Sequence, residues 1–447
     1  MIMKDKCPQL PAKSAGLSPL VKERLAATLA KLVPQWQAEP ALDYKRVTRP
    51  TGPHSCSTTT ESYQGTQSWG AFRQKVAETE IIQSLEKLLH EQQPELLGYV
   101  MTDHGQNGRK IQDCFSLCMI LSKEIVRRIG SSSLKEAVTG VVSDLDNLLI
   151  TEIAECQVFT ALNGLKLPDE VDRIDLDEGL YIRALTNEEI AELGSYDIAS
   201  SIFLYDFSPL SVTTALISKR PSLIKLSLNN KEHIPVSASH QLYRAQISNV
   251  LEALHILKSG CVGRVVSSIT VHPTILPNMN GTSSAPIAVN PCRVMQLSQE
   301  DIDKFVLLYK ALVATQRNEV KIAAARLLDA ESRLSPVDAL LDAVIGLEAL
   351  LNNDRAEISF RVALNYGFLG PIADRRKRFD DIREVYKIRS SVVHGGLNKD
   401  ASRLYKHAQL AKECLRDALT RFLTDESLMG NKKLDGDFWL DRVLPPI

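Results

Sequence analysis

Residues 298–425 form a succession of helical segments separated by short links, and no other feature of the chain constrains its fold as strongly. Ser298 is a favourable N-cap for the first segment, and Ser335 followed by Pro336 opens another, because proline fits in the first turn of a helix. Short links make consecutive helices run antiparallel, so this part is predicted to be an all-α bundle. The expected helices span residues 298–316, 319–331, 335–352, 356–368, 375–394 and 400–423.

Residues 158–297 have a different pattern. Short runs rich in β-branched and aromatic residues, such as "RIDLDEGLYIRAL" and "GRVVSSITV", are bounded by Gly, Pro or Asn and predict strands. A capping-box pattern that begins at Thr186 and a helical stretch at 240–258 predict helices among them. This region is therefore predicted to be an α+β domain, and its sequence does not indicate its role.

The rest of the chain completes a predicted multidomain, mainly α protein, in which an N-terminal α+β region precedes a C-terminal helical bundle. Ser18 and Pro19 form a helix start of the same kind as Ser335 and Pro336. A stretch rich in Gly, Pro, Ser and Thr is typical of a linker or a mobile arm. The predicted segments are an N-terminal helix (1–35), this linker (36–68), a helical region (69–157), the α+β domain (158–297), the bundle (298–425) and a tail (426–447).

Composition excludes some classes of function. The chain has 447 residues, more than the roughly 250–300 at which a single core stops growing, so about two to four domains are expected. Its net charge of −1 argues against binding nucleic acid or membranes through overall charge, and any such contact needs a local basic patch. No apolar run approaches the roughly 18 residues that span a bilayer, and the first twenty residues lack the apolar core of a signal peptide. We expect a cytoplasmic protein with no membrane contact.

Neither a metal nor a cofactor is expected. Eight cysteines are scattered along the chain, as is usual in a reducing compartment. Cys114 and Cys118 lie four residues apart on an apolar helix, where two buried small side chains are commoner than a pair of metal ligands. The histidines show no metal-ligand spacing, and His407 is expected to be an ordinary helix residue.

The residue type that most suggests chemistry is an arginine on an apolar helix face. On a helical wheel of residues 379–394, the apolar side chains fill a little under half the circumference, and Arg389 lies near the middle of that arc. An unpaired buried guanidinium costs several kcal/mol, so it implies a partner or a cleft. Glu348 interrupts the apolar stripe of 335–352 in the same way. We therefore predict that Glu348 and Arg389 lie within side-chain reach. A buried ion pair that fixes the register of the bundle is the alternative to a functional role.

His394 ends the same helix, directly before Gly395 and Gly396, which are suited to a left-handed C-cap. The C-terminus of a helix favours the imidazolium by about 0.3–1 kcal/mol, so both protonation states are available near neutral pH. Such a histidine can act as a general acid or base, which contributes roughly 10²–10⁴ in rate. A neighbouring arginine can bind a scissile phosphate. Together the two residues suit metal-free cleavage of RNA, in which the 2′-hydroxyl attacks the adjacent phosphate.

Helix geometry limits this pairing. Residues five apart on a helix rise about 7.5 Å and point about 140° away from each other. Arg389 and His394 therefore meet only if the last turn unwinds at the glycines, or if two copies of the chain combine their residues. Ser390 lies four residues before His394 and either orients the imidazole or is an exposed helix serine.

The segment "VYKIRSSVVHGG" resembles the R-x4–6-H signature of the HEPN (higher eukaryotes and prokaryotes nucleotide-binding) superfamily. Together with "ALLDAVIGLEALL" and "AEISFRVALNYGFL", it is most similar to the Apea-like branch over residues 299–425. The resemblance implies a helical bundle that homodimerises and acts as a metal-independent endoribonuclease, in prokaryotic antiviral defence, abortive infection or toxin–antitoxin pairs. It implies that Arg389 and His394 are catalytic, with Ser390 as the polar residue after the arginine and Glu348 as a supporting acid.

A basic run at the start of the signature helix is a candidate contact for the RNA backbone. Cations there are unfavourable to the helix dipole, which hints at a ligand, although a solvated loop is the simpler interpretation. The expected partners are RNA, a second copy of the chain, and an antitoxin or trigger protein that acts through the N-terminal region. An inactive scaffold that binds a nucleotide or a protein partner is the alternative function. The candidate RNA-binding residues are Arg375, Arg376, Lys377, Arg378 and Tyr386.

Overall fold

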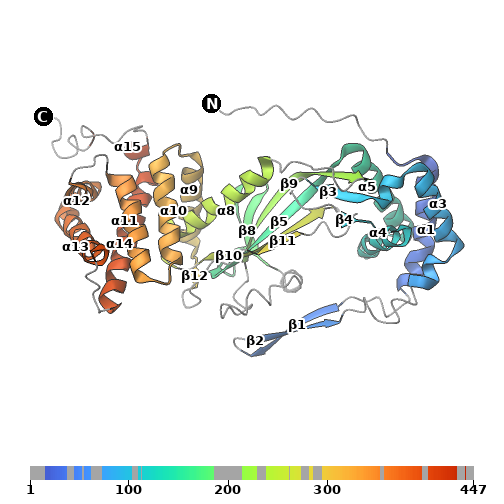
Figure 1. The fold of residues 1–447 in the computed structure, drawn as a ribbon, viewed down its shortest axis with the longest axis horizontal. Helices are drawn as coiled ribbons and strands as arrows, with labels where there is room; N and C mark the ends of the chain where they lie inside the picture. The colour runs from blue at the N-terminus through green and yellow to red at the C-terminus, as the bar shows by residue number, and fades with distance from the viewer. Residues whose placement is uncertain are drawn as a thin grey trace.

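The protein is mainly helical and is laid out along one long axis, with helices at both ends and a β-sheet between them (Figure 1). This confirms the mainly α class predicted from the sequence. The structure, a computed structural model, describes residues 16–37, 45–52, 55–61, 73–102, 109–111, 113–185, 214–228, 238–260, 262–272, 281–284, 294–352, 357–394, 401–429 and 438.

The N-terminal helices pack through leucine-rich faces. Ser18 accepts a hydrogen bond from the Val21 N–H at 3.3 Å, which makes it the predicted N-cap of the first helix. Ser133 begins another helix with a capping box completed by Glu136. Each fully buried leucine contributes about 1.5–3 kcal/mol to this packing. The helices are α1 (Pro19–Gln37), α3 (Glu80–Gln92), α4 (Cys114–Ile129) and α5 (Leu134–Thr151), with a 3₁₀ turn, η2 (Pro94–Leu97).

Strands occur where the sequence was interpreted as linker or helix. The expected linker contains an antiparallel hairpin of β1 (Lys45–Gly52) and β2 (Ser55–Glu61). Three consecutive threonines in β2 are β-branched residues that favour strands, but the neighbouring Gly, Pro and Ser residues obscured this signal. The expected helical region likewise contains β3 (Tyr99–Thr102) and β4 (Arg109–Lys110). The predicted capping box at Thr186 lies outside the described residues.

An antiparallel sheet of eight described strands forms the centre of the molecule, in the order β11-β10-β5-β9-β3-β4, with β8 and β7 continuing from β9. The first part of β9 pairs with β8 and its last part with β3, so two strands share one edge. Gly179 in the β7–β8 turn has a φ of +70°, and a Cβ there would lie 2.7 Å from the Lys219 carbonyl oxygen, so glycine is required. The bounds are β5 (Ile153–Asn163), β7 (Arg173–Asp177), β8 (Leu180–Ala184), β9 (Thr214–Ser227), β10 (Gly263–His272) and β11 (Gly281–Ser284).

Helix α8 (Ala238–Leu257) joins the sheet to the C-terminal bundle. The Tyr243 hydroxyl on α8 is hydrogen-bonded to Thr160 of β5. The same helix packs against α9, α10 and α14 of the bundle. The short parallel pair of β6 (Leu165–Lys166) and β12 (Met295–Gln296) makes a second connection. A single continuous cluster of buried apolar side chains therefore runs from Leu17 to Leu428.

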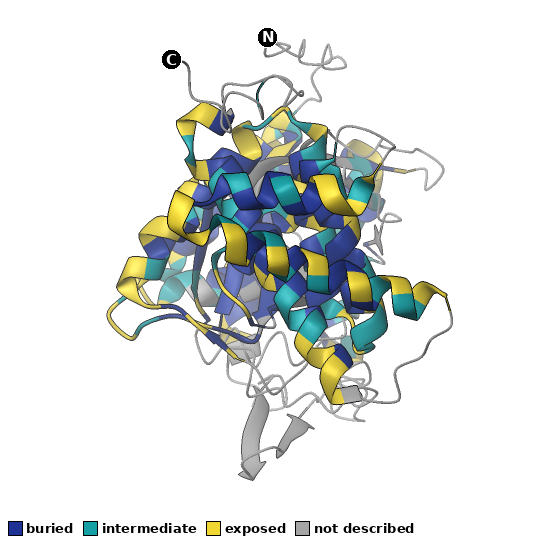
Figure 2. Ribbon diagram, turned by 90° about the vertical axis from the view of Figure 1, so that its left-hand side faces the viewer, coloured by how far each residue is buried: buried dark blue, intermediate teal, exposed yellow. Residues whose placement is uncertain are grey.

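The six helices predicted for the bundle are all present, and their caps explain where they begin. Ser298 forms a capping box with Asp301, and Ser335 accepts a hydrogen bond from the Asp338 N–H at 3.4 Å. Figure 2 looks onto the bundle and shows buried residues on the inward faces of its helices and exposed residues outside. No helix in the described part of the chain is long and apolar enough to cross a membrane. The helices are α9 (Gln299–Ala314), α10 (Asn318–Ser332), α11 (Pro336–Leu351), α12 (Ile358–Leu369), α13 (Arg375–Val393) and α14 (Ala401–Thr424), followed by α15 (Glu426–Met429).

Candidate functional site

Glu348 and Tyr386 form the best-defined polar contact near the signature. The Tyr386 hydroxyl on α13 donates a hydrogen bond to Glu348 Oε1 on α11, 3.0 Å away. Burial raises the pKa of Tyr386 well above its usual value, and the Glu348 carboxylate adds to the rise, whereas Arg389 opposes it. The hydroxyl therefore keeps its proton near neutral pH and remains a donor.

Arg389 lies on the same face of α13, one turn after Tyr386. Its side chain is half-buried, and its Nε is buried without a hydrogen-bond partner. Within the described part of the chain, no ion pair within 4.0 Å joins it to Glu348. Both charges influence the pKa of the Tyr386 hydroxyl, and Glu348 accepts its hydrogen bond from that hydroxyl. The side-chain reach of Glu348 and Arg389 therefore stays a prediction. The register-fixing ion pair offered as an alternative is not formed among these residues.

His394 and Ser390 are exposed and lie away from Arg389. Helix α13 continues to Val393, and the His394 N–H donates to the Ser390 carbonyl at 3.0 Å. The helix therefore turns the two side chains about 140° apart, with Arg389 half-buried and His394 exposed. His394 itself is the C-cap, with φ −91° and ψ 17°, whereas Gly395 and Gly396 lie outside the described residues.

Arg376 and Lys377, in the basic run, are exposed but already paired. Arg376 Nε lies 2.9 Å from Asp380 Oδ2, and Lys377 Nζ lies 2.8 Å from Asp381 Oδ2, one turn along the helix in both cases. Exposed pairs of this kind contribute about 0–1 kcal/mol, so a phosphate can displace them at little cost. Arg375 is different, because its guanidinium lies over the Phe368 ring at 5.1 Å and its Nε is buried without a partner.

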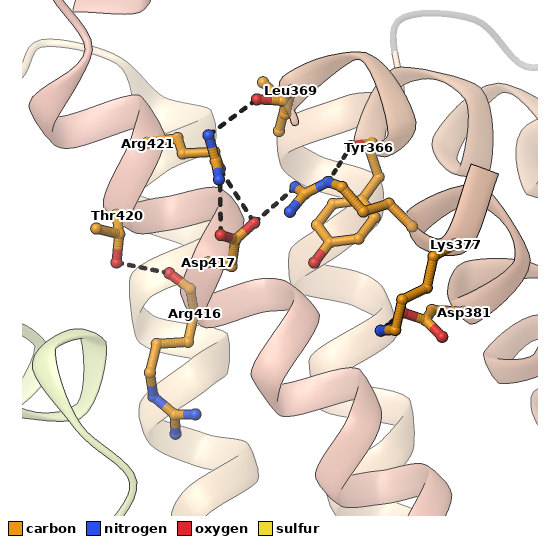
Figure 3. A network of polar contacts seen from close by, with 9 residues as sticks. Tyr366, Leu369, Lys377, Asp381, Arg416, Asp417, Thr420 and Arg421 are labelled. Carbon is orange, nitrogen blue, oxygen red and sulfur yellow. Dashed lines mark hydrogen bonds and ion pairs between the residues drawn. The ribbon is translucent and has the colours of Figure 1, made fainter. Parts of the chain in front are cut away.

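Arg378 corrects the interpretation of the basic run as one RNA-binding surface. It is buried, its guanidinium stacks 3.9 Å over the ring of Tyr366, and its Nε donates to the Tyr366 carbonyl at 3.0 Å. Its terminal nitrogen bonds Asp417 at 2.6 Å. Figure 3 shows that Asp417 also accepts from Arg421, whose guanidinium reaches the Leu369 carbonyl. Arg378 therefore holds α12, α13 and α14 together and is not available to RNA.

Tyr386 is also placed differently from the prediction. Only 9% of its surface is exposed, so its ring does not offer a free face on which a base could stack. Its hydroxyl acts on Glu348 instead. Tyr386 is therefore a candidate for organising the site rather than for contacting RNA.

A second polar cluster, which the sequence analysis did not find, lies between α8, α10 and α14. Buried Glu331 accepts hydrogen bonds from Lys412, at 2.8 Å, and from Arg416. Nearby on α8, burial and the Asp329 carboxylate raise the pKa of Glu252 to about 7, and burial lowers the pKa of His255. Lys412 and Arg416 lie four residues apart on a mainly apolar face of α14, and that spacing is the signal that would have indicated a buried acid.

Comparison with protein-family models, with curated proteins and with solved structures finds no match for this chain. Among the described residues, no group of three His, Cys, Asp or Glu side chains is arranged to hold a metal ion.

Proposed function

We propose that the protein is a metal-independent endoribonuclease of the HEPN type, with Arg389 and His394 at its active site. The observation that supports this most directly is the Arg389 Nε, a charged donor that is buried on an apolar face without a partner. A buried donor left unpaired costs about 1–3 kcal/mol or more when charged, and an anionic ligand would remove that cost. An RNA phosphate is an anion suited to the planar guanidinium.

The proposed reaction needs only groups that RNA and the protein provide. The 2′-oxygen attacks the adjacent phosphorus while the bond from phosphorus to the 5′-oxygen breaks, which leaves a cyclic phosphate. The attacking hydroxyl loses one proton and the departing oxygen gains one, and His394 serves one of these transfers. Arg389 stabilises the charge that develops on the non-bridging oxygens.

We infer that the complete site contains residues of two copies of the chain. His394 is exposed and Arg389 is half-buried, and the five residues between them turn the two side chains about 140° apart on α13. Two copies that associate through this end of α13 would bring the exposed imidazole of one toward the guanidinium of the other. The proposed role in prokaryotic defence, abortive infection or toxin action, with residues 1–297 sensing a trigger, depends on the family resemblance alone.

The test is cleavage of labelled RNA in EDTA by the full-length protein. We expect the wild type to produce cyclic-phosphate ends, and Arg389→Ala and His394→Ala to lower the rate by roughly 10²–10⁴. Matched controls are Arg383→Ala, an exposed arginine of the same helix, and His90→Ala, an exposed histidine of α3. Equal cleavage by all five proteins would reveal a contaminating nuclease and contradict the proposal.

One observation favours the alternative of an inactive scaffold. Arg376 and Lys377 are each neutralised by an aspartate one turn away, so these two residues add little excess positive charge at the start of the signature helix. A scaffold would bind a nucleotide or a protein partner without cutting RNA. It would therefore give identical RNA profiles for the wild type and for both signature variants.

A further inference from the structure

The arrangement of Glu348, Tyr386 and Arg389 is unusual for a half-buried carboxylate and a half-buried guanidinium on neighbouring helices. An arginine and a carboxylate in a partly buried site ordinarily pair directly, since the guanidinium matches both carboxylate oxygens. Here the carboxylate accepts its hydrogen bond from a tyrosine, and the arginine Nε has no partner.

Tyr386 is well placed to cause this separation. Its ring is buried between the helices, so its hydroxyl has little freedom to turn toward water. The hydroxyl meets Glu348 Oε1 at 3.0 Å from the same face of α13 that carries Arg389, one turn later. The hydroxyl and the guanidinium are therefore two donors on one face of α13, and Glu348 accepts from the hydroxyl.

The result is a half-buried guanidinium whose Nε has no hydrogen-bond partner and which forms no direct ion pair with Glu348. If Glu348 turned to Arg389, the donor that faces a bound phosphate would be occupied. A phosphate would then have to displace a buried charge-assisted pair before it could bind.

Building on the proposed nuclease function, we propose that Tyr386 is a positioning residue that holds Glu348 in place and so keeps the Arg389 guanidinium available to a phosphate oxygen of RNA. Tyr386 touches neither the phosphate nor the reacting atoms. It acts on Arg389 indirectly, by making a pair between Arg389 and Glu348 less favourable than a contact between Arg389 and an RNA phosphate.

A tyrosine that only stabilises the fold would form the same hydrogen bond. The structural role and the positioning role differ in whether a second substitution can restore the RNA binding that Tyr386→Phe loses. Tyr386→Phe removes only the hydroxyl and keeps the ring that packs in the core. Under our proposal, Tyr386→Phe weakens RNA binding because Glu348 is then able to pair with Arg389. Adding Glu348→Gln removes that competing charge and should restore binding. If the hydroxyl only stabilises the fold, the second substitution brings no recovery.

Binding is measured by fluorescence anisotropy with a labelled 2′-O-methyl oligoribonucleotide, which lacks the attacking hydroxyl and is not cut. We expect Tyr386→Phe to weaken binding about ten- to a hundredfold, the equivalent of one charge-assisted hydrogen bond. Tyr386→Phe with Glu348→Gln should return to within about threefold of the wild type. Tyr309→Phe, which removes the hydroxyl of a buried tyrosine in α9, is the matched control and should change nothing.

A crystal structure of Tyr386→Phe separates this claim from the nuclease proposal. We expect Glu348 and Arg389 to lie within 4.0 Å of each other in that variant, whether or not the protein cuts RNA. If the wild type neither binds nor cleaves RNA, the nuclease proposal fails, and the crystal structure alone decides the positioning claim. Glu348 and Arg389 remaining apart in the variant, or no recovery of binding in the double variant, would overturn it.

Discussion

Arg416 of α14 donates a hydrogen bond from its Nε to the backbone carbonyl of His255 in α8, 2.8 Å away. The same side chain bonds Glu331 of α10, which also accepts from Lys412. Three helices from two predicted domains thus meet at one buried acid. The next residue of α14, Asp417, bonds Arg378 of the signature helix. Helix α14 therefore connects the α+β region to the helix that carries Arg389.

Glu331→Gln is expected to lower the free energy of unfolding by about 3–5 kcal/mol, because it leaves the buried cations Lys412 and Arg416 without their counter-charge. Urea unfolding followed by circular dichroism measures the change. Glu300→Gln is the matched control, since that carboxylate is exposed and pairs with Lys304 on the helix surface, so its loss should cost less than about 1 kcal/mol. Similar losses for both variants would show that the buried network contributes no more than a surface pair.

Helix boundaries in the bundle were predictable because their signals are local. Ser298 and Ser335 cap their helices through the residues that follow them directly, and these patterns can be read in a few letters. The strands β1 and β3 were missed for the opposite reason. A strand is stabilised by pairing with distant residues, and short runs among Gly, Pro and Ser do not show which partner they have.

The candidate site was predictable in part. The apolar stripes placed Glu348 and Arg389 on the apolar faces of their helices, and both side chains are half-buried. That Tyr386 donates to Glu348 depends on the distance and rotation between α11 and α13, which hydrophobic periodicity does not determine. Arg378 was misinterpreted because four consecutive cations suggest an exposed run. Yet Arg378 lies four residues before Ile382, on the buried face of α13. Its side chain packs against Gly370, where an added Cβ would lie 2.4 Å from the Arg378 Cδ.

Glu252 should make stability depend on pH. Its folded pKa of about 7 lies above the ordinary value of 4.5, so the folded state binds its proton more tightly than the unfolded state does. Its contribution is therefore fully present below about pH 4.5 and is lost as the pH rises through about 7. At pH 8, the free energy of unfolding of Glu252→Gln should exceed that of the wild type by on the order of 2–3 kcal/mol, so the variant is the more stable protein. At pH 4.5 the two free energies of unfolding should be nearly equal. A constant difference across that range would contradict the raised pKa.

Arg378→Lys is expected to lower the free energy of unfolding by about 1–3 kcal/mol, although charge is conserved. An ammonium cannot stack over Tyr366 and at the same time bond its carbonyl and Asp417, as the planar guanidinium does. Arg376→Lys, at an exposed position of the same helix, should change stability by less than about 0.5 kcal/mol. Thermal unfolding of the two variants side by side makes the comparison, and equal values would show that Arg378 acts as a charge alone.

The basic run makes a separate prediction about RNA binding, measured with the same uncleavable oligoribonucleotide over a range of salt concentrations. If Arg376 and Lys377 contact phosphates, replacing both by alanine should reduce the slope of log affinity against log salt by about 1.4, or about 0.7 for each contact to a single strand. Arg378→Lys should leave the slope unchanged, because its guanidinium is bonded to Tyr366 and Asp417 inside the bundle. An unchanged slope in the double alanine variant would mean that Asp380 and Asp381 retain these cations, and that RNA binds elsewhere.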